Sequence, residues 1–351
     1  MTAVQTTAFE EFLGKYMDAA WQQVLAEVRP MIHEVDRNAT EIWFRFYPLA
    51  LHELLAASND PDQTAKRLLL EGNYKIEQQL NTSHRFLYGH RFWAEAKRVV
   101  QTHARATTPT QPESSVAALV EIIRKLSREV AAAVKQDASL TLGITAVAVM
   151  SLRQVGLDKF SIASTEIMLD RAQAKKTPDQ ILRERARDDS QGLFGFLKTE
   201  DKKWTVTFDE TAPDGKFKCV HAEEIASGAA RDTRDWRAVD PRCIEGPIPV
   251  QCRAAACGTC WVGILAGAEK LSPVNRLERK SMNEFGYINT EDERPLIRLA
   301  CMAQTTGAVS VVIPPWNGIF GRGLNQKAEG REVTGRQVTG SQVKGKEVAG
   351  Q

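Results

Sequence analysis

The chain has 351 residues, which is enough for about two domains with a sizeable core. Its 46 basic and 44 acidic residues give a formal net charge of +2, and 43 % of all residues are hydrophobic. This composition is typical of a soluble globular protein, and the absence of a basic cluster argues against a nucleic-acid partner.

The N-terminal residues contain no basic region followed by an apolar run, so the sequence predicts no secretory signal and a cytoplasmic location. The longest apolar stretch runs from Ala138 to Leu152. It is too short to span a bilayer and is bounded by charged residues. We therefore expect a buried core helix there and no membrane insertion.

Residues 1–170 are predicted to form an all-α helical domain. Apolar residues recur at spacings of three and four, for example at Phe9, Phe12 and Tyr16, and again between 116 and 134. Clusters of Asn, Ser, Thr and Pro separate these segments, which indicates six or seven helices packed as a bundle.

Histidine and aromatic residues are frequent in this helical half. His33 and Asp36 have the three-residue spacing of a ligand pair on one helix face, whereas His84 and His90 are six apart and should face different sides of a helix. A second metal centre, haem or di-iron, would make the chain an enzyme. We favour a packed core, or an aromatic patch that docks a partner protein.

Residues 171–201 are predicted to form a charged linker, in which Thr177 and Pro178 are the cap and first residue of a helix. From Trp204 onward the pattern changes to short runs of β-forming residues. The expected strands are 204–208, 217–220, 261–265, 296–303 and 309–314.

Two helices are expected between these strands, over 222–229 and over 273–285. For the second helix, Ser272 is the predicted N-cap and Gly286 lies past the end. A small mixed sheet crossed by a helix is the arrangement that this order allows.

The last part of the chain, residues 317–351, has a different character. A five-residue repeat starts at Gly330 and contains one apolar residue in each unit. Such a segment cannot bury a core, so the sequence predicts a disordered low-complexity tail.

All six cysteines lie in the C-terminal half, and four of them form a pattern. Four residues separate Cys252 from Cys257, two separate Cys257 from Cys260, and Cys301 follows in a Leu-Ala-Cys element. This is the plant-type spacing of the four thiolates that hold a [2Fe–2S] cluster. A zinc site built from the same cysteines is the alternative, although zinc sites prefer two pairs with short internal spacing.

The segment from about Lys202 to Pro315 resembles the plant-type and bacterial [2Fe–2S] ferredoxin domain. The resemblance rests on the loop C-R-A-A-A-C-G-T-C and on the Leu-Ala-Cys element. It implies a β-grasp fold over residues 202–316 and a [2Fe–2S] cofactor. The implied ligands are Cys252, Cys257, Cys260 and Cys301.

One position of the loop departs from the family pattern, because Ala255 stands where the family usually has glycine. If that position needs a positive φ, alanine costs on the order of 1 kcal/mol. Arg253 and Arg298 flank ligands, and their charge is expected to raise the reduction potential above the roughly −400 mV of plant-type clusters. Cys219 lies outside the pattern and is predicted to be a buried small hydrophobe.

These features predict one-electron transfer, as a ferredoxin-like carrier or as the electron-transfer subunit of an oxidoreductase, with redox proteins as partners. No Gly-rich nucleotide-binding fingerprint follows a strand, so a complete reductase is not expected. The alternatives are a redox-sensing regulator and an enzyme with a second metal centre. Residues 201–316 contain 15 basic and 16 acidic residues, so long-range charge is not expected to steer a partner.

Overall fold

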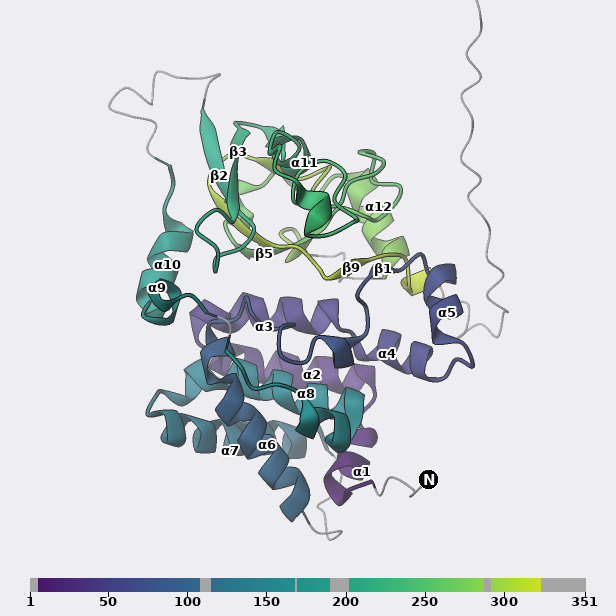
Figure 1. The fold of residues 1–351 in the computed structure, drawn as a ribbon, viewed down its shortest axis with the longest axis vertical. Coiled ribbons are helices and arrows are strands. Elements are labelled where there is room, and N and C mark those ends of the chain that lie inside the picture. Colours follow the sequence, from purple (N-terminus) through teal and green to yellow (C-terminus); the bar gives the residue numbers. More distant parts are fainter. Residues whose placement is uncertain (1–5, 108–114, 168, 190–201, 287–291, 323–351) are drawn as a thin grey trace, which may run out of the picture.

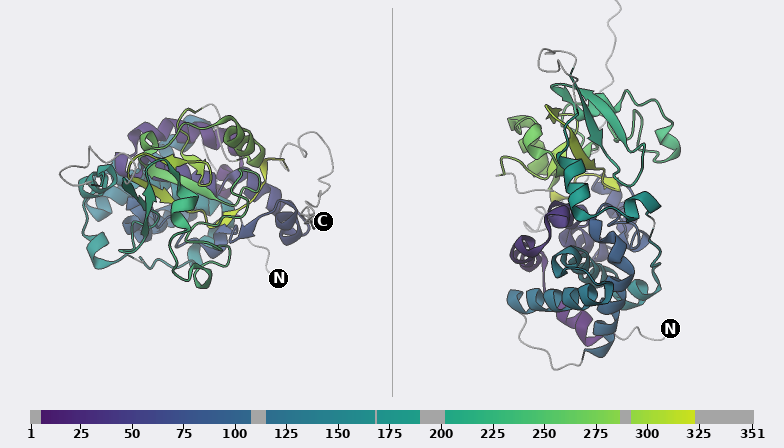
Figure 2. Two further views of the ribbon diagram at one scale, coloured as in Figure 1. Left: turned by 90° about the horizontal axis from the view of Figure 1, so that it is seen from above. Right: turned by 90° about the vertical axis from the view of Figure 1, so that its left-hand side faces the viewer.

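A computed structural model of the chain has a helical N-terminal half and a sheet-containing C-terminal half (Figure 1). It describes residues 6–107, 115–167, 169–189, 202–286 and 292–322. The sheet half lies over the helical half, as the side view confirms (Figure 2). This division agrees with the predicted α+β class.

The helical half contains eight α-helices within the described residues, where the sequence predicted six or seven. Their bounds are α1 (Ala8–Gly14), α2 (Asp18–Val28), α3 (Glu34–Phe46), α4 (Leu49–Ala56), α5 (Pro61–Arg67), α6 (Trp93–Ala106), α7 (Val116–Val134) and α8 (Ala138–Ile162). In α7, buried Leu119, Ile123, Leu126 and Val130 follow the three-and-four spacing, and this face packs the helix into the bundle.

α8 is the central helix of this half and packs against α1, α3, α6 and α7. The apolar stretch that the sequence assigned to a core helix forms its first part. Among the described residues, α8 is the one helix that is long and apolar enough to cross a membrane. Within the protein, 83 % of its most apolar window is buried, which is the environment of a core helix.

The sheet half is built on a five-stranded sheet with the order β3-β2-β8-β5-β6. The strands are β2 (Lys203–Thr207), β3 (Lys216–Val220), β5 (Trp261–Ala266), β6 (Ile297–Leu299) and β8 (Val309–Val312). β2 pairs antiparallel with β3, as the predicted hairpin requires, and parallel with β8. The sheet half also contains β4 (Glu223–Glu224), β7 (Gln304–Thr305), α11 (Ile225–Ala229) and α12 (Arg276–Phe285).

The start of α12 differs from the prediction. Asn275, not Ser272, is the N-cap, because its side chain accepts the N–H of Glu278 at 2.8 Å. Ser272 pairs with Gln304 instead, donating its N–H at 2.9 Å and accepting the Gln304 N–H on Oγ at 3.1 Å. The C-terminal prediction is confirmed, since Gly286 ends the helix in the left-handed region with φ 79°.

Two short helices, α9 (Arg171–Ala174) and α10 (Pro178–Ala186), lie in the segment predicted to be a charged linker. Thr177 caps α10 through a reciprocal bond with the side chain of Gln180. Pro178 occupies the first turn, as the sequence predicted. At least this part of the connector is therefore folded.

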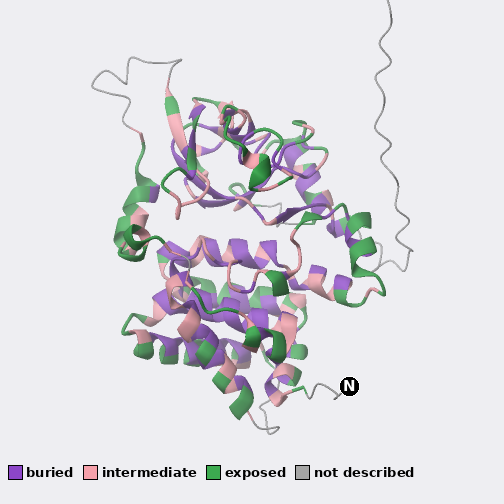
Figure 3. Ribbon diagram, viewed as in Figure 1, coloured by how far each residue is buried: buried purple, intermediate pink, exposed green. Residues whose placement is uncertain are grey.

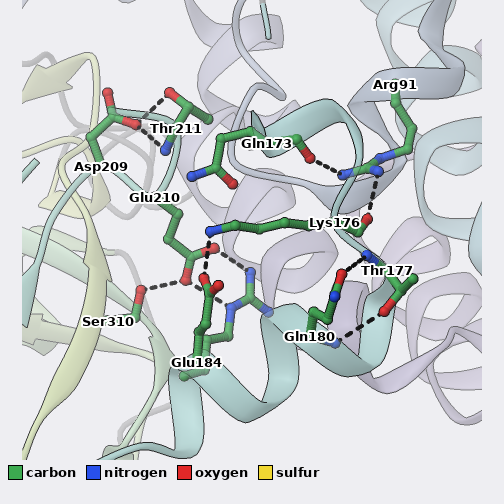
Figure 4. A network of polar contacts seen from close by, with 11 residues as sticks. Arg91, Gln173, Lys176, Thr177, Gln180, Glu184, Asp209, Glu210, Thr211 and Ser310 are labelled. Carbon is green, nitrogen blue, oxygen red and sulfur yellow. Dashed lines mark hydrogen bonds and ion pairs between the residues drawn. The ribbon is translucent and has the colours of Figure 1, made fainter. Parts of the chain in front are cut away.

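A buried arginine on α10 ties the two halves together. The Arg185 guanidinium donates to the carbonyl oxygen of Val35 in α3 at 2.6 Å. It also donates to both carboxylate oxygens of Glu210, which follows β2, at 2.8 Å each. Ser310 of β8 completes the partners of this carboxylate (Figure 4). This bidentate ion pair fixes α10 between the helices and the sheet.

The main contact between the halves joins α3 to β5. Gly263 of β5 permits the close approach, because a Cβ there would lie 2.6 Å from Ile42 Cγ2 and 3.1 Å from Phe46 Cζ. The Asn38 side chain also donates to the carbonyl oxygen of Leu265 at 3.2 Å. Buried residues of the two halves therefore form one continuous apolar core, and most of α3 is buried (Figure 3).

A second contact is made by β9 (Trp316–Asn317), which pairs antiparallel with β1 (Glu71–Gly72) of the helical half. The fully buried indole of Trp316 donates to the carbonyl oxygen of Phe46 at 2.8 Å. The chain that leaves the sheet is thereby anchored at the C-terminal end of α3.

The predicted tail begins too early at residue 317. Residues 317–322 are part of the fold, because Ile319 donates its N–H to the carbonyl oxygen of Leu68 at 2.8 Å and Phe320 is only 2 % exposed. The five-residue repeat lies outside the described residues, so the prediction of disorder for it stays a prediction.

We predict that Gly263→Ala lowers the free energy of unfolding by about 1–3 kcal/mol, since the new methyl group overpacks the contact with Ile42, whose χ1 is stiff in a helix. The control is Gly14→Ala, because a Cβ at Gly14 meets nothing within 4 Å. Urea denaturation of both variants tests this. Equal stability of the two variants would contradict the account of the interface.

Candidate metal centre

The four predicted ligands come from two separate stretches that strand pairing brings together. The loop 252–260 leads directly into β5, and Cys301 lies two residues beyond β6. β5 and β6 pair antiparallel, with Trp261 opposite Leu299. The N–H of Ala300 also donates to the carbonyl oxygen of Cys260 at 2.8 Å. The register of these two strands therefore sets the position of Cys301 beside Cys260.

The thiols are arranged as two pairs, Cys252 with Cys257 and Cys260 with Cys301. In the first pair, burial raises the pKa of Cys252, whereas backbone N–H donors and a hydrogen bond with the Cys257 thiol lower it. The hydrogen bonds together outweigh burial, so the net shift of the Cys252 pKa is downward. In the second pair, donation to Cys301 and burial raise the pKa of Cys260, and the same bond lowers the pKa of Cys301. Each pair therefore contains one cysteine whose pKa is lowered and one whose pKa is raised.

This arrangement fits a two-iron cluster better than a single zinc ion. In a [2Fe–2S] cluster with four cysteines, each iron takes two protein thiolates. A structural zinc ion needs four ligands around one point. Among the described residues, no group of three or more His, Cys, Asp or Glu side chains is placed to hold a single ion. The two thiol pairs are the observation on which the fit to the cluster rests.

The backbone of the loop enters the left-handed region at three positions, Arg253 (φ 51°), Ala255 (φ 55°) and Gly258 (φ 68°). Ala255 stands where the family usually has glycine, and it does adopt the positive φ that glycine would tolerate more easily. Gly258 is needed for a second reason, since a Cβ there would lie 3.0 Å from the ring of Phe285 in α12.

These backbone turns direct donors at sulfur. The N–H groups of Ala254 and Ala256 donate to Cys252 Sγ at 3.4 and 3.3 Å. The hydroxyl of Thr259 lies 3.1 Å from Cys257 Sγ. Successive N–H groups that converge on one atom form an anion-binding nest, which favours the thiolate state required for iron binding.

The two thiol pairs differ in exposure. Cys260 and Cys301 are buried, at 2 % and 7 % exposed, whereas Cys252 and Cys257 are half-buried. The loop around the first pair, Cys252 and Cys257, is open to solvent, since Arg253, Ala254 and Ala256 are exposed. One edge of the site therefore reaches the surface and the other faces the core.

Residues outside the cysteine motif also hold the loop 252–260 in place. The ring of Phe285 packs edge-on against Trp261, with centroids 5.4 Å apart. The Asn317 side chain of β9 donates to the carbonyl oxygen of Thr259 at 3.3 Å. No sequence signal points to Asn317, because it lies in the segment predicted to be a disordered tail.

Both arginines that flank ligands are paired with carboxylates. Arg298 is buried and forms a bidentate bond with Glu278 of α12 at 2.9 Å for each contact. Arg253 pairs with Glu245 at the surface. These carboxylates offset part of the positive charge beside the site, and the expected rise in reduction potential stays a prediction. The role of Glu278 has no sequence signal, because this residue lies in a charged run that looks solvent-exposed.

Cys219 and Cys243 lie outside the site. Burial raises the pKa of Cys219 to about 12 and that of Cys243 to about 11, so both are neutral thiols at physiological pH. Cys219 is fully buried against α11, where a Cβ on Gly228 would meet its sulfur. The Cys243 thiol donates to the carbonyl oxygen of Pro247 at 3.3 Å.

The histidines of the helical half are not arranged as the sequence suggested. His84 and His90 do not face different sides of a helix. They lie in a loop and a 3₁₀ turn with their Nδ1 atoms 2.9 Å apart, and both rings are fully buried. His33 caps α3, while Asp36 accepts the N–H groups of Tyr88 and Gly89. Asp36, His84 and His90 are therefore parts of a packed core, and half-buried His33 is a helix cap.

Comparison with known protein families supports the assignment of a [2Fe–2S] cofactor. Residues 238–306 match the model of the 2Fe-2S iron-sulfur cluster binding domain, and this segment contains all four cysteines of the motif. The segment is a [2Fe–2S] ferredoxin-type domain and binds a [2Fe–2S] cluster. Comparisons with curated proteins and with solved structures found no match.

We predict that Ala255→Val abolishes cluster incorporation, because a β-branched residue does not tolerate the left-handed conformation of this position. The control is the neighbouring Ala254→Val, which has no positive φ and is exposed. Iron content and visible absorbance per chain are measured after anaerobic purification. Full incorporation in Ala255→Val would contradict the assigned role of the loop backbone.

Proposed function

We propose that the chain transfers single electrons between redox proteins, as a ferredoxin-like carrier or as the electron-transfer subunit of an oxidoreductase. When bound, a [2Fe–2S] cluster supplies one-electron chemistry at a potential near −400 mV for plant-type sites. The observation that carries the proposal is the exposure of one edge of the site. A partner that contacts the Cys252–Cys257 edge approaches the redox centre, while the buried edge stays protected from solvent.

The surface around this edge favours docking through shape and apolar contact. Its charged side chains are already paired with one another, as in Arg253 with Glu245 and Arg231 with Glu223. Ile244, next to Glu245, is 51 % exposed. Since local ion pairs cancel at a distance, we expect a partner to be held by contact and not steered by a strong field.

The remaining parts of the proposal concern the topology and the location. The order β3-β2-β8-β5-β6, with β2 and β8 parallel at its centre, supports a β-grasp arrangement of the sheet half. All six cysteines are described, and none forms a disulfide. Cysteines without disulfides are typical of a reducing compartment, which supports a cytoplasmic location.

The experiment measures oxidation of the dithionite-reduced protein by ferricyanide in a stopped-flow instrument at low ionic strength. We expect Arg253→Glu to slow the reaction several-fold, because it adds negative charge where the trianionic acceptor must approach. One electron passes from each reduced chain to one ferricyanide ion.

The control is Arg98→Glu, which makes the same change of charge at an exposed side chain of α6 in the helical half. Both variants must keep the wild-type iron content. Equal rates in the two variants would show that electrons do not leave through the Cys252–Cys257 edge.

A further inference from the structure

Asn317 links the cysteine loop to the helical half of the molecule. It is 1 % exposed, and its side-chain Nδ2 group donates to the carbonyl oxygen of Thr259 at 3.3 Å. Thr259 lies between the predicted ligands Cys257 and Cys260, and its hydroxyl is 3.1 Å from Cys257 Sγ. One side chain from outside the cysteine motif therefore holds the residue that joins two of the predicted ligands.

The segment 315–319, which carries Asn317, is held by the helical half. Three hydrogen bonds join the segment to that half, from Trp316 Nε1 to the Phe46 carbonyl oxygen at 2.8 Å, from the Asn73 N–H to the Pro315 carbonyl oxygen at 3.0 Å, and from the Ile319 N–H to the Leu68 carbonyl oxygen at 2.8 Å. Gly318 permits this close approach, because a Cβ there would lie 2.7 Å from the carbonyl oxygen of Leu69. The helical half therefore sets the position of Asn317.

The bond between Asn317 and Thr259 lies in buried surroundings. Thr259 is 7 % exposed and Cys260 is 2 % exposed, so water screens the dipole of the Asn317 amide poorly. The peptide bond between Thr259 and Cys260 is trans, and holding its carbonyl oxygen also fixes the direction of the Cys260 N–H. The same bond polarises this N–H, which makes it a stronger donor.

Given the one-electron function proposed above, we propose that Asn317 is a positioning residue that raises the reduction potential of the cluster. Reduction adds negative charge to the cluster, and hydrogen bonds around the cysteine ligands tune its potential. The donor end of the Asn317 amide is directed at the loop that receives this charge, so the bond favours the reduced state. Through Asn317, the helical half sets the potential of a site to which it supplies none of the predicted ligands.

This coupling acts in both directions. If the bond favours the reduced state, reduction strengthens the hold of the loop on Asn317 by the same free energy. The segment 315–319 should therefore open less often in the reduced protein than in the oxidised protein. The Ile319 N–H, which donates to the helical half, reports this opening through its rate of exchange with solvent.

The first test measures the midpoint potential of the full-length, cluster-loaded protein by a dithionite titration followed by electron paramagnetic resonance. Asn317→Leu keeps the approximate size of the side chain and removes the donor. We expect it to lower the equilibrium constant for reduction by at least threefold, equal to about 28 mV for one electron.

The matched control is Asn38→Leu, which removes another bond between the two halves, to the carbonyl oxygen of Leu265 at 3.2 Å. Leu265 lies near the end of β5 that is away from the loop, so this variant should keep the wild-type potential. An unchanged potential in Asn317→Leu, or an equal shift in Asn38→Leu, would overturn the proposal and leave the proposed electron transfer standing.

The second test compares hydrogen–deuterium exchange of the segment 315–319 in the oxidised and the dithionite-reduced protein. We expect slower exchange at Ile319 on reduction in the wild type and in Asn38→Leu, and no effect of reduction in Asn317→Leu. Equal exchange in the two states of the wild type would contradict the coupling.

Iron content separates the remaining outcomes. If Asn317→Leu lacks the cluster, Asn317→Ala removes the same donor without adding volume and takes its place in both tests. Absence of the cluster from that variant as well would make Asn317 a residue of cluster assembly and would overturn its role in the potential. Absence of the cluster from the wild type would instead overturn the proposed function.

Discussion

Four sulfur atoms that carry negative charge repel one another when they are held together, and the sheet half is organised to oppose this repulsion. The left-handed residues Arg253 and Ala255 turn backbone N–H groups toward sulfur. The pairing of β5 with β6 sets Cys301 beside Cys260. Local backbone geometry therefore provides the electrostatic stabilisation, and the strand register provides the position.

The helical half contributes to the same arrangement through direct contacts. Gly263 lets α3 approach β5, the strand that begins directly after the cysteine loop. Trp316 is fixed to the end of α3, and the neighbouring Asn317 holds the carbonyl group of Thr259 within the loop. A change in the packing of α3 can therefore reach the redox site through one strand, although α3 supplies none of its predicted ligands.

Much of this could be predicted from the sequence where the signal is local. The cysteine spacing, the hairpin of β2 and β3, the cap at Thr177 and the glycine at 286 each depend on a few neighbouring residues. The choice between Ser272 and Asn275 as N-cap could not be made, because pairing with Gln304 decides it. That contact lies some 30 residues further along the chain.

The failures share one physical cause, which is tertiary pairing of polar groups. A charged run around Glu278 looks exposed until Arg298 is seen to neutralise it in the core. The spacing of His84 and His90 predicts two different faces of one helix, whereas their rings meet where a loop leads into a 3₁₀ turn. Charge and periodicity describe each residue separately, whereas these roles exist only in the folded chain.

The most direct test of the central claim compares two alanine variants of the full-length protein, Cys301→Ala and Cys243→Ala, after anaerobic purification. The account predicts that Cys301→Ala loses the visible absorbance and the electron paramagnetic resonance signal of the dithionite-reduced protein. Cys243→Ala should keep both, since that thiol lies outside the cysteine motif and donates to a backbone carbonyl group. Unchanged signals in Cys301→Ala would contradict the assignment of the four cysteines.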